Sequence, residues 1–174
     1  MAGARHQPPN CCRRVGLAGQ GASSADRPPE VALVVDASVA LKWILDEPDS
    51  HRAQALAESQ EELLVPDFLL HEATNICWLQ VRKGRWTPDE AREGLALLRA
   101  QVPPTPTGDL DLHDVALEIG LTTNHSTYDT LYVAFAVAMD ASGVVVADGP
   151  FLRDMANHPD PVLARLLIPL ADWG

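Results

Sequence analysis

The stretch VALVVDASVALKW, residues 31–43, decides the fold class of this protein. Residues 31–35 are a short apolar run rich in valine, which predicts a buried strand, and residues 38–45 have the pattern of a helix. Asp36 stands where the strand ends and the helix begins. A charge at such a buried position is costly unless it has a partner or a function. We therefore expect Asp36 to have a binding partner or a function elsewhere in the chain.

Further strands and helices alternate along the chain after this stretch. Residues 63–65 and 144–147 are short apolar runs that predict two more buried strands. Helical patterns cover residues 50–60, 67–83, 87–100, 110–119, 126–140 and 150–156, and a final apolar segment covers 162–170. This alternation predicts an α/β fold, in which helices cover both faces of a parallel sheet.

Two of these helices carry recognisable boundary signals. Thr87, followed by Pro88 and Glu90, predicts a helix start with a capping box. Gly120 is expected to end the helix over 110–119, and Gly143 is expected to mark a turn before the next strand. The helix over 126–140 is apolar on nearly every side, so it is expected to be buried.

Composition limits the classes of function. Hydrophobic residues make up 47% of the 174 residues, which is enough for one domain with a real core. The net charge is -11, and the first 30 residues hold four basic and two acidic residues. Residues 31–174 therefore hold 9 basic and 22 acidic residues, a net charge of -13. Such an excess of acid argues against DNA binding through a broad basic face.

The cysteines and the N-terminal region bear on the compartment. Cys11, Cys12 and Cys77 form no pair or cluster with zinc spacing, and their low count favours a reducing compartment. No apolar run has the length of a membrane span. Arg13 and Arg14 are not followed by the apolar segment of an export signal. We expect a cytoplasmic protein with a disordered extension at residues 1–29 and one folded domain at 30–174.

Four acids stand at positions that are unfavourable for a charge. Asp36 and Asp148 each follow a buried strand, and ligands of parallel sheets bind at the carboxyl ends of the strands. Glu72 shares a largely apolar helical stripe with Asn75, and Asp129 begins the buried helix. Clustered carboxylates raise one another's pKa values, and a divalent cation relieves that conflict. All-oxygen ligands suit Mg²⁺ or Mn²⁺ rather than zinc.

Each acid also has a purely structural explanation. Asp36 could cap the helix that follows it, and Asp148 could begin a turn with Gly149. Asp129 could complete a capping box with the serine three residues before it. Glu72 could pair with an arginine. These explanations stay open for each residue taken singly, whereas the four acids together favour a metal site.

Four blocks of the chain resemble a known family. The segments VVDASVALKW, VPDFLLHEATNICW, STYDTLYVAFA and VVVAD resemble, in order and spacing, the blocks of PIN-domain ribonucleases, and most of all VapC-type toxins of bacterial type II toxin–antitoxin systems. The resemblance covers roughly residues 31–170. It implies a PIN-like three-layer α/β/α fold with a central, mostly parallel sheet.

The resemblance also implies a function and a site. Asp36, Glu72, Asp129 and Asp148 match the acidic residues that bind Mg²⁺ or Mn²⁺, and Ser38 and Asn75 match supporting polar positions. These acids would direct a metal-activated water to an RNA phosphodiester, leaving a 5′-phosphate and a 3′-hydroxyl. The resemblance further implies a homodimer and a cognate antitoxin protein as partner.

The last block departs from the pattern of the family. Many relatives carry a threonine where this chain has Val146, and basic residues directly after the last acid. Here Gly149 and Pro150 follow Asp148, and the nearest basic residue is Arg153.

Several other side chains are weaker candidates for the site. Lys42 and Arg153 are possible RNA contacts, although a solvent-facing role is favoured for Lys42. Arg82, Lys83 and Arg85 form a basic cluster that suits RNA contact or the negative end of a helix dipole equally well. His71 and His125 are read as structural. The aromatic residues Trp43, Trp78 and Tyr132 are read as core residues rather than as stacking platforms for bases.

Two other classes of function compete with the nuclease. A PIN-like domain that binds RNA or a protein without cutting would explain the departures around Asp148. A phosphotransfer or phosphatase domain would usually need a second aspartate two residues after the first, where this chain has Ser38. A nucleotide-binding sheet would need a glycine-rich loop after the first strand, and DASVAL contains no glycine.

Overall fold

A computed structural model describes residues 32–173 of the chain. The predicted disordered extension at residues 1–29, together with Cys11 and Cys12, lies outside the described residues. The described part contains one sheet of four strands, all parallel, in the order β2-β1-β3-β4. Its strands are β1 (Leu33–Val35), β2 (Leu63–Leu64), β3 (Gly143–Val146) and β4 (Leu167–Pro169). The prediction of an α/β fold with a mostly parallel sheet is confirmed.

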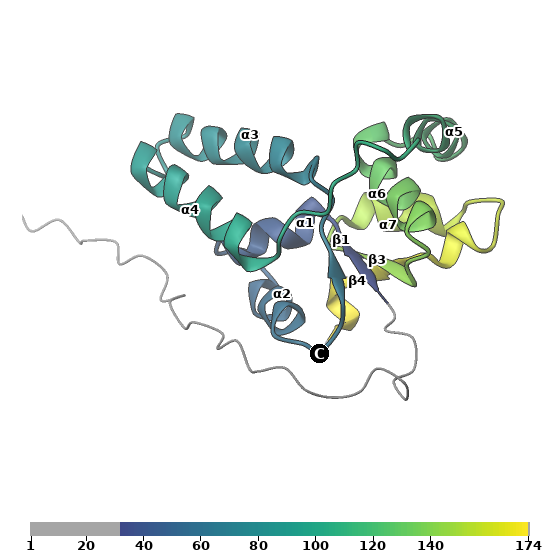
Figure 1. Ribbon diagram of the computed structural model, residues 1–174, viewed down its shortest axis with the longest axis horizontal. Helices are drawn as coiled ribbons and strands as arrows, with labels where there is room; N and C mark the ends of the chain where they lie inside the picture. The colour runs from purple at the N-terminus through teal and green to yellow at the C-terminus, as the bar shows by residue number, and fades with distance from the viewer. Residues whose placement is uncertain (1–31, 174) are drawn as a thin grey trace, which may run out of the picture.

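Helices flank this sheet on two sides, α1–α4 on one side and α5–α7 on the other (Figure 1). The α-helices are α1 (Ala37–Ala40), α2 (Ser50–Ala57), α3 (Leu69–Arg82), α4 (Pro88–Gln101), α5 (His113–Thr123), α6 (Thr127–Ala138) and α7 (Gly149–Ala156). Short 3₁₀-helices are η1 (Leu41–Trp43), η2 (Leu163–Arg165) and η3 (Leu170–Asp172). None of the helices in residues 32–173 has the length and apolarity needed to cross a membrane.

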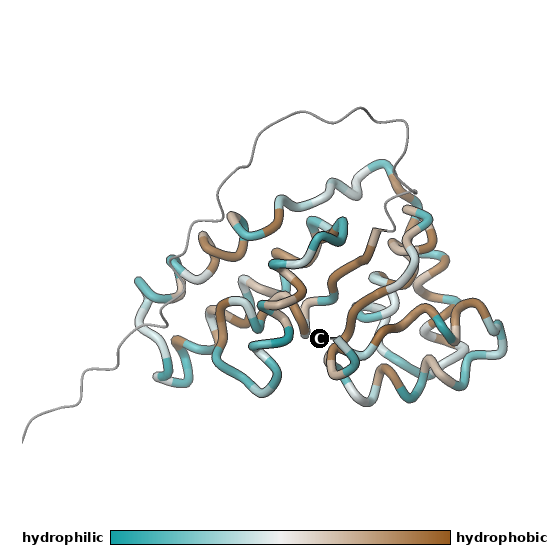
Figure 2. The backbone as a smooth tube through the Cα atoms, turned by 90° about the horizontal axis from the view of Figure 1, so that it is seen from below, coloured by the Kyte–Doolittle hydropathy of each residue, from teal (hydrophilic) through white to brown (hydrophobic). Residues whose placement is uncertain are grey.

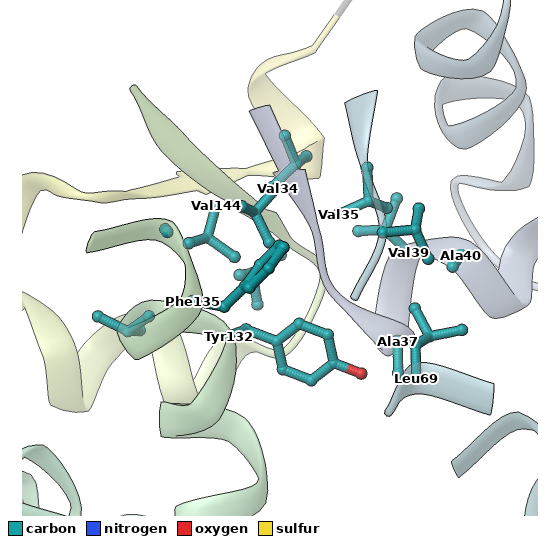
Figure 3. Packing of buried hydrophobic residues seen from close by; sticks show 14 of the residues in the cluster. Val34, Val35, Ala37, Val39, Ala40, Leu69, Tyr132, Phe135 and Val144 are labelled. Carbon is teal, nitrogen blue, oxygen red and sulfur yellow. The ribbon is translucent and has the colours of Figure 1, made fainter. Parts of the chain in front are cut away.

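The core lies between the central strands and α6. Every residue of β1 and β3 is buried, as expected for parallel strands covered on both faces. Helix α6 contacts both strands, and the rings of Tyr132 and Phe135 lie under Val34 and Val144 (Figure 3). The same apolar strands stand out at the centre of the backbone trace (Figure 2). This packing holds the carboxyl ends of β1 and β3 rigidly side by side.

The strand order creates a natural site between β1 and β3. From β1 the chain continues to β2 on one side of the sheet, whereas from β3 it continues to β4 on the other side. The helices that follow the two strands therefore diverge, and a crevice at such a switch point is where open α/β sheets bind ligands. Asp36 follows β1 directly, and Asp148 lies two residues after the end of β3.

The helix boundaries confirm one predicted signal and correct two others. Thr87 caps α4 with the predicted capping box, in which Glu90 accepts a hydrogen bond from the Thr87 backbone. Gly120 does not end α5. The helix continues to Thr123 and ends at Asn124, whose φ of 55° supplies the left-handed conformation in place of glycine. Gly143 is the first residue of β3 rather than part of a turn. Glycine suits this position because a Cβ there would lie 2.5 Å from Ile168 Cδ1 of β4.

Two of the three aromatic core predictions hold. Trp43 is buried and donates a hydrogen bond of 2.8 Å from Nε1 to the carbonyl of Ala53. Tyr132 is fully buried. The prediction for Trp78 is wrong, since 52% of this residue is exposed on α3.

Candidate functional site

Asp36 combines burial with a capping role. The residue is only 4% exposed, and its Oδ1 accepts a hydrogen bond of 2.8 Å from the backbone N–H of Ser38 at the start of α1. Burial is the largest cause that raises the pKa of Asp36, to about 7. The hydrogen bonds from Ser38 lower this pKa, and the charges of Glu72 and Asp129 raise it. The capping explanation is therefore correct, but it leaves a buried acid whose charge lacks a cationic partner in the described part of the chain.

Ser38 ties the two strand ends together. Its Oγ accepts a hydrogen bond of 2.9 Å from the backbone N–H of Ala147, directly after β3. One residue therefore holds the strand end that carries Asp36 against the strand end that carries Asp148.

Glu72 reaches the site from α3. The hydroxyl of Tyr132 donates a hydrogen bond of 2.8 Å to Glu72 Oε1. In Figure 3 this hydroxyl points toward Ala37 of α1 and Leu69 of α3. Burial raises the pKa of Glu72, the bond from Tyr132 lowers it, and the charge of Asp129 raises it. The sequence reading of Tyr132 as a core residue missed this role, although a phenol in an apolar helix three residues after Asp129 is a usable signal.

Asp129 is held by a histidine. His125 Nε2 lies 3.0 Å from Asp129 Oδ2, and His125 Nδ1 lies 2.8 Å from Asp154 Oδ2 on α7. The imidazole also stacks on Phe151, with ring centroids 4.7 Å apart. Burial is the main cause that raises the pKa of Asp129, while His125 lowers it and Asp148 raises it. His125 thus contacts the site directly, a role that the reading of it as merely structural did not specify.

Asp129 does not form the capping box considered from the sequence. Ser126 caps α6 by accepting a hydrogen bond of 3.2 Å from the N–H of Tyr128. The Asp129 carboxylate is instead engaged with His125.

Asp148 caps α7. Its Oδ1 accepts a hydrogen bond of 2.9 Å from the backbone N–H of Phe151, so it begins a helix rather than an isolated turn. Gly149 and Pro150 form the first turn of α7, where proline is well suited because its missing N–H has no helical partner. A Cβ at Gly149 would lie 3.4 Å from Arg153 Nη1. The segment that departs from the family pattern therefore forms a short helix, which brings the Arg153 side chain next to Gly149.

We call Asp36, Glu72, Asp129 and Asp148 the acidic cluster. A model of the PIN domain family matches residues 33–154, a range that contains all four acids. The chain belongs to the PIN domain family. Members of this superfamily are generally nucleases and usually use divalent metal ions.

A solved structure supports the same fold. The crystal structure of PAE2754 from Pyrobaculum aerophilum is similar to this PIN domain, with a TM-score of 0.56 and 21% sequence identity. The similarity covers 81% of this chain and 92% of that one. A comparison with curated proteins finds no match.

The chemistry of the acidic cluster suits a hard divalent cation. All its donors are carboxylate oxygens, and electrostatic repulsion acts between Asp36 and Glu72, between Asp36 and Asp129, between Glu72 and Asp129, and between Asp129 and Asp148. Within residues 32–173, however, no three His, Cys, Asp or Glu side chains are already arranged to hold one ion. Cation binding by this PIN domain would therefore require the carboxylates to turn toward a common point.

The remaining predicted site residues differ in exposure and in the groups that they contact. Asn75 is exposed on α3, one turn after Glu72. Lys42 is not the solvent-facing lysine expected, because its side chain is 10% exposed and lies 3.2 Å from Glu47 Oε2. Arg82, Lys83 and Arg85 are exposed at the far end of α3 and just beyond it. His71 is exposed, with Nδ1 3.2 Å from the carbonyl of Phe68.

Proposed function

We propose that this PIN domain is a Mg²⁺- or Mn²⁺-dependent endoribonuclease that cleaves RNA phosphodiester bonds with a metal-activated water. One observation carries the proposal. Asp36 is buried at the β1/β3 switch point, and its pKa of about 7 reflects burial together with the charges of Glu72 and Asp129. A fold that places several repelling acids at its ligand-binding edge loses stability unless a cation is recruited there.

The acidic cluster is the proposed cation site. Asp36, Glu72, Asp129 and Asp148 would hold the ion. When bound, it would lower the pKa of the attacking water and stabilise charge on the phosphate and the leaving oxygen. It would also allow an acidic protein to approach a polyanion.

The protein's own contribution is orientation. Asp36 is fixed by its bond from Ser38 N–H, and Glu72 by the bond from the Tyr132 hydroxyl. Asp129 is fixed by His125, which Asp154 and Phe151 hold from the other side. Carboxylates that are held before substrate arrives lose less conformational entropy when they bind a cation.

We assign this nuclease to the toxin component of a toxin–antitoxin pair. Support comes from the four blocks around the acidic cluster, which resemble VapC-type toxins. An antitoxin protein and a second copy of the chain are the proposed partners. Expression in a bacterial host should arrest growth, and co-expression of an antitoxin encoded beside the toxin gene should restore it. Growth that continues at a high level of folded protein would count against the toxin role.

Cleavage is tested directly with a mixed RNA pool. The purified protein should cut the RNA in Mg²⁺ or Mn²⁺ and stop in EDTA, and Asp36→Asn should be inactive. Asp111→Asn is the matched control, because Asp111 is an exposed acid outside the acidic cluster. Cleavage in EDTA, or equal cleavage by Asp36→Asn, would overturn the proposal. RNA binding with no cleavage by folded, metal-loaded protein would instead identify a non-cleaving binding module.

A further inference from the structure

An exposed tryptophan lies on the helix that carries Glu72. Trp78 is 52% exposed even though the Arg82 guanidinium lies 5.2 Å from the centre of its ring. An aromatic ring of this size normally packs into a core or faces a partner. The contact with Arg82 is a cation–π pair, in which the guanidinium lies over one face of the ring.

The position of Trp78 connects it to the acidic cluster. Residues three or four apart are neighbours on a helix, so Glu72, Asn75, Trp78 and Arg82 follow one another along the surface of α3. Asn75, Trp78 and Arg82 are exposed, and we call these three residues the α3 strip. At 1.5 Å per residue and 3.6 residues per turn, Trp78 lies about 9 Å along the helix axis from Glu72 and about 120° around it. Nucleotides rise about 3.4 Å each in a stacked strand, so a strand with one phosphate at the acidic cluster reaches Trp78 within a few nucleotides.

The other exposed residues along α3 and directly after it are polar or basic. His71, Thr74 and Asn75 are exposed on the same helix, and Lys83 and Arg85 follow Arg82 at its end. Within residues 32–173 no ion pair joins Arg82, Lys83 or Arg85 to a carboxylate. Trp78 is also the only exposed large apolar residue that belongs to α3.

These features fit a nucleic acid better than a protein. A protein-docking face usually gathers several apolar side chains, as α5 does with Leu117 and Leu121, which are one turn apart. An exposed aromatic ring beside basic groups that have no carboxylate partner is an arrangement that binds single strands, with bases stacked on the ring and phosphates near the basic groups. Three of the 9 basic residues of residues 31–174 gather here on an otherwise acidic protein.

We infer that the α3 strip binds single-stranded RNA next to the acidic cluster, with a base stacked on Trp78 and the adjoining phosphate held by Arg82. This inference rests on the proposed ribonuclease function, and it adds a surface that binds the strand beside the acidic cluster. A base within a duplex is already stacked on both faces, so it cannot also stack on an aromatic side chain.

Binding and cleavage are tested separately. Asp36→Asn serves as the background, so that a fluorescein-labelled, single-stranded RNA of mixed sequence can be titrated by anisotropy in Mg²⁺ without being cut. Adding Trp78→Ala should weaken binding about 5- to 100-fold, the range for loss of one stacked base. Trp78→Phe should retain part of the affinity. Arg82→Ala should weaken binding and lower the dependence of log K on log salt by about one unit.

A control variant on α5 and the possible outcomes distinguish RNA binding by the α3 strip from RNA cleavage. Leu121→Ala removes an exposed apolar side chain from α5 and should leave RNA affinity unchanged. Equal affinity of the Trp78→Ala and parent proteins would overturn the inference, even if the wild-type protein cleaves RNA. If the Trp78→Ala variant instead kept its RNA affinity and no longer bound a co-expressed antitoxin, that result would assign the α3 strip to protein binding. Failure of the wild-type protein to cleave, with Trp78-dependent RNA binding intact, would reject the nuclease but not the strip. The inference would also be overturned if duplex RNA competed for binding as strongly as single-stranded RNA of the same length.

Discussion

The hydroxyl of Tyr132 on α6 donates a 2.8 Å hydrogen bond to Glu72 Oε1 on α3, joining two residues that are 60 positions apart. The ring of the same tyrosine is fully buried and lies edge-on to Phe68, with centroids 4.9 Å apart. Core packing therefore sets the position of the donor that holds Glu72. The bond connects the interior of the fold to the acidic cluster.

Removing only this hydroxyl should affect the site more than the fold. Tyr132→Phe keeps the ring in place but leaves Glu72 without its donor, and hydrogen bonds to charged groups contribute about 1.5–3 kcal/mol. We expect RNA cleavage to fall by about 10- to 100-fold, with a loss of about 1 kcal/mol in the free energy of unfolding. Steady-state kinetics and urea denaturation measure the two effects. Tyr128→Phe, in an exposed tyrosine of the same helix, should change neither, and a similar loss in both variants would contradict a specific role for Tyr132.

The pH dependence of stability should report on Asp36. Its pKa rises from 3.8 in an unfolded chain to about 7 in the fold, because burial disfavours the charged form. Folding then favours the protonated acid, so this contribution is fully present below about pH 4 and is lost as pH rises toward 7. The pKa values of Glu72 and Asp129 are raised as well, which gives the same sign. The loss from Asp36 is on the order of 4 kcal/mol, since one pKa unit corresponds to about 1.4 kcal/mol.

Denaturation of metal-free protein at pH 5 and pH 8 measures this effect. The Asp36→Asn variant keeps an oxygen that can accept the Ser38 bond, and its stability should vary less between the two pH values. Mg²⁺ should raise the Tm of the wild-type protein more at pH 8 than at pH 5, because only the charged acids bind it. An equal pH profile in wild type and variant would show that Asp36 is not the group responsible.

The histidine contact should control how well the acidic cluster binds a cation. Asp154→Asn leaves Asp129 untouched but weakens the anchor of His125, so Asp129 loses orientation. Outer-shell changes of this kind lower metal affinity by about 10- to 100-fold. Titration with Mn²⁺, followed by electron paramagnetic resonance, measures the affinity without any RNA. Asp111→Asn provides the matched control, and unchanged Mn²⁺ affinity in Asp154→Asn would rule out this positioning role.

The link between the two strand ends can be tested through Ser38. Ser38→Ala removes the acceptor of the 2.9 Å bond from Ala147, which should cost about 1 kcal/mol in the free energy of unfolding and lower cleavage several-fold. Ser142→Ala is the control, because Ser142 donates a comparable 3.1 Å bond to the Ala32 carbonyl at the opposite end of these strands. Both variants should lose similar stability. Only Ser38→Ala should lose activity, and equal activity of the two variants would contradict the link.

Local chemistry explains why several elements were predictable from the sequence. The apolar runs before Asp36 and Asp148 are buried strands because valine-rich segments pack well on both faces of a parallel sheet. Thr87 and Glu90 cap a helix because their side chains bond to backbone groups within the same turn. Such signals depend only on residues close together in the chain. The end of α5 was misplaced because both Gly120 and Asn124 suit a helix terminus, and only the observed backbone distinguishes them.

Packing between elements sets which face of each helix meets which neighbour. Helical periodicity placed Trp78 on α3, but its exposure depends on how α3 packs against its neighbours. The burial of the Lys42 side chain beside Glu47 likewise depends on the folded structure. Tyr132 reaches Glu72 because the fold brings α6 near α3. His125 lies one turn before Asp129, and Asp154 holds its ring because α7 lies beside the start of α6. Local patterns in the chain were enough to identify the acids at strand ends and helix starts. The crossover between β1 and β3 determined that these acids repel one another, because charges interact through space and not along the chain.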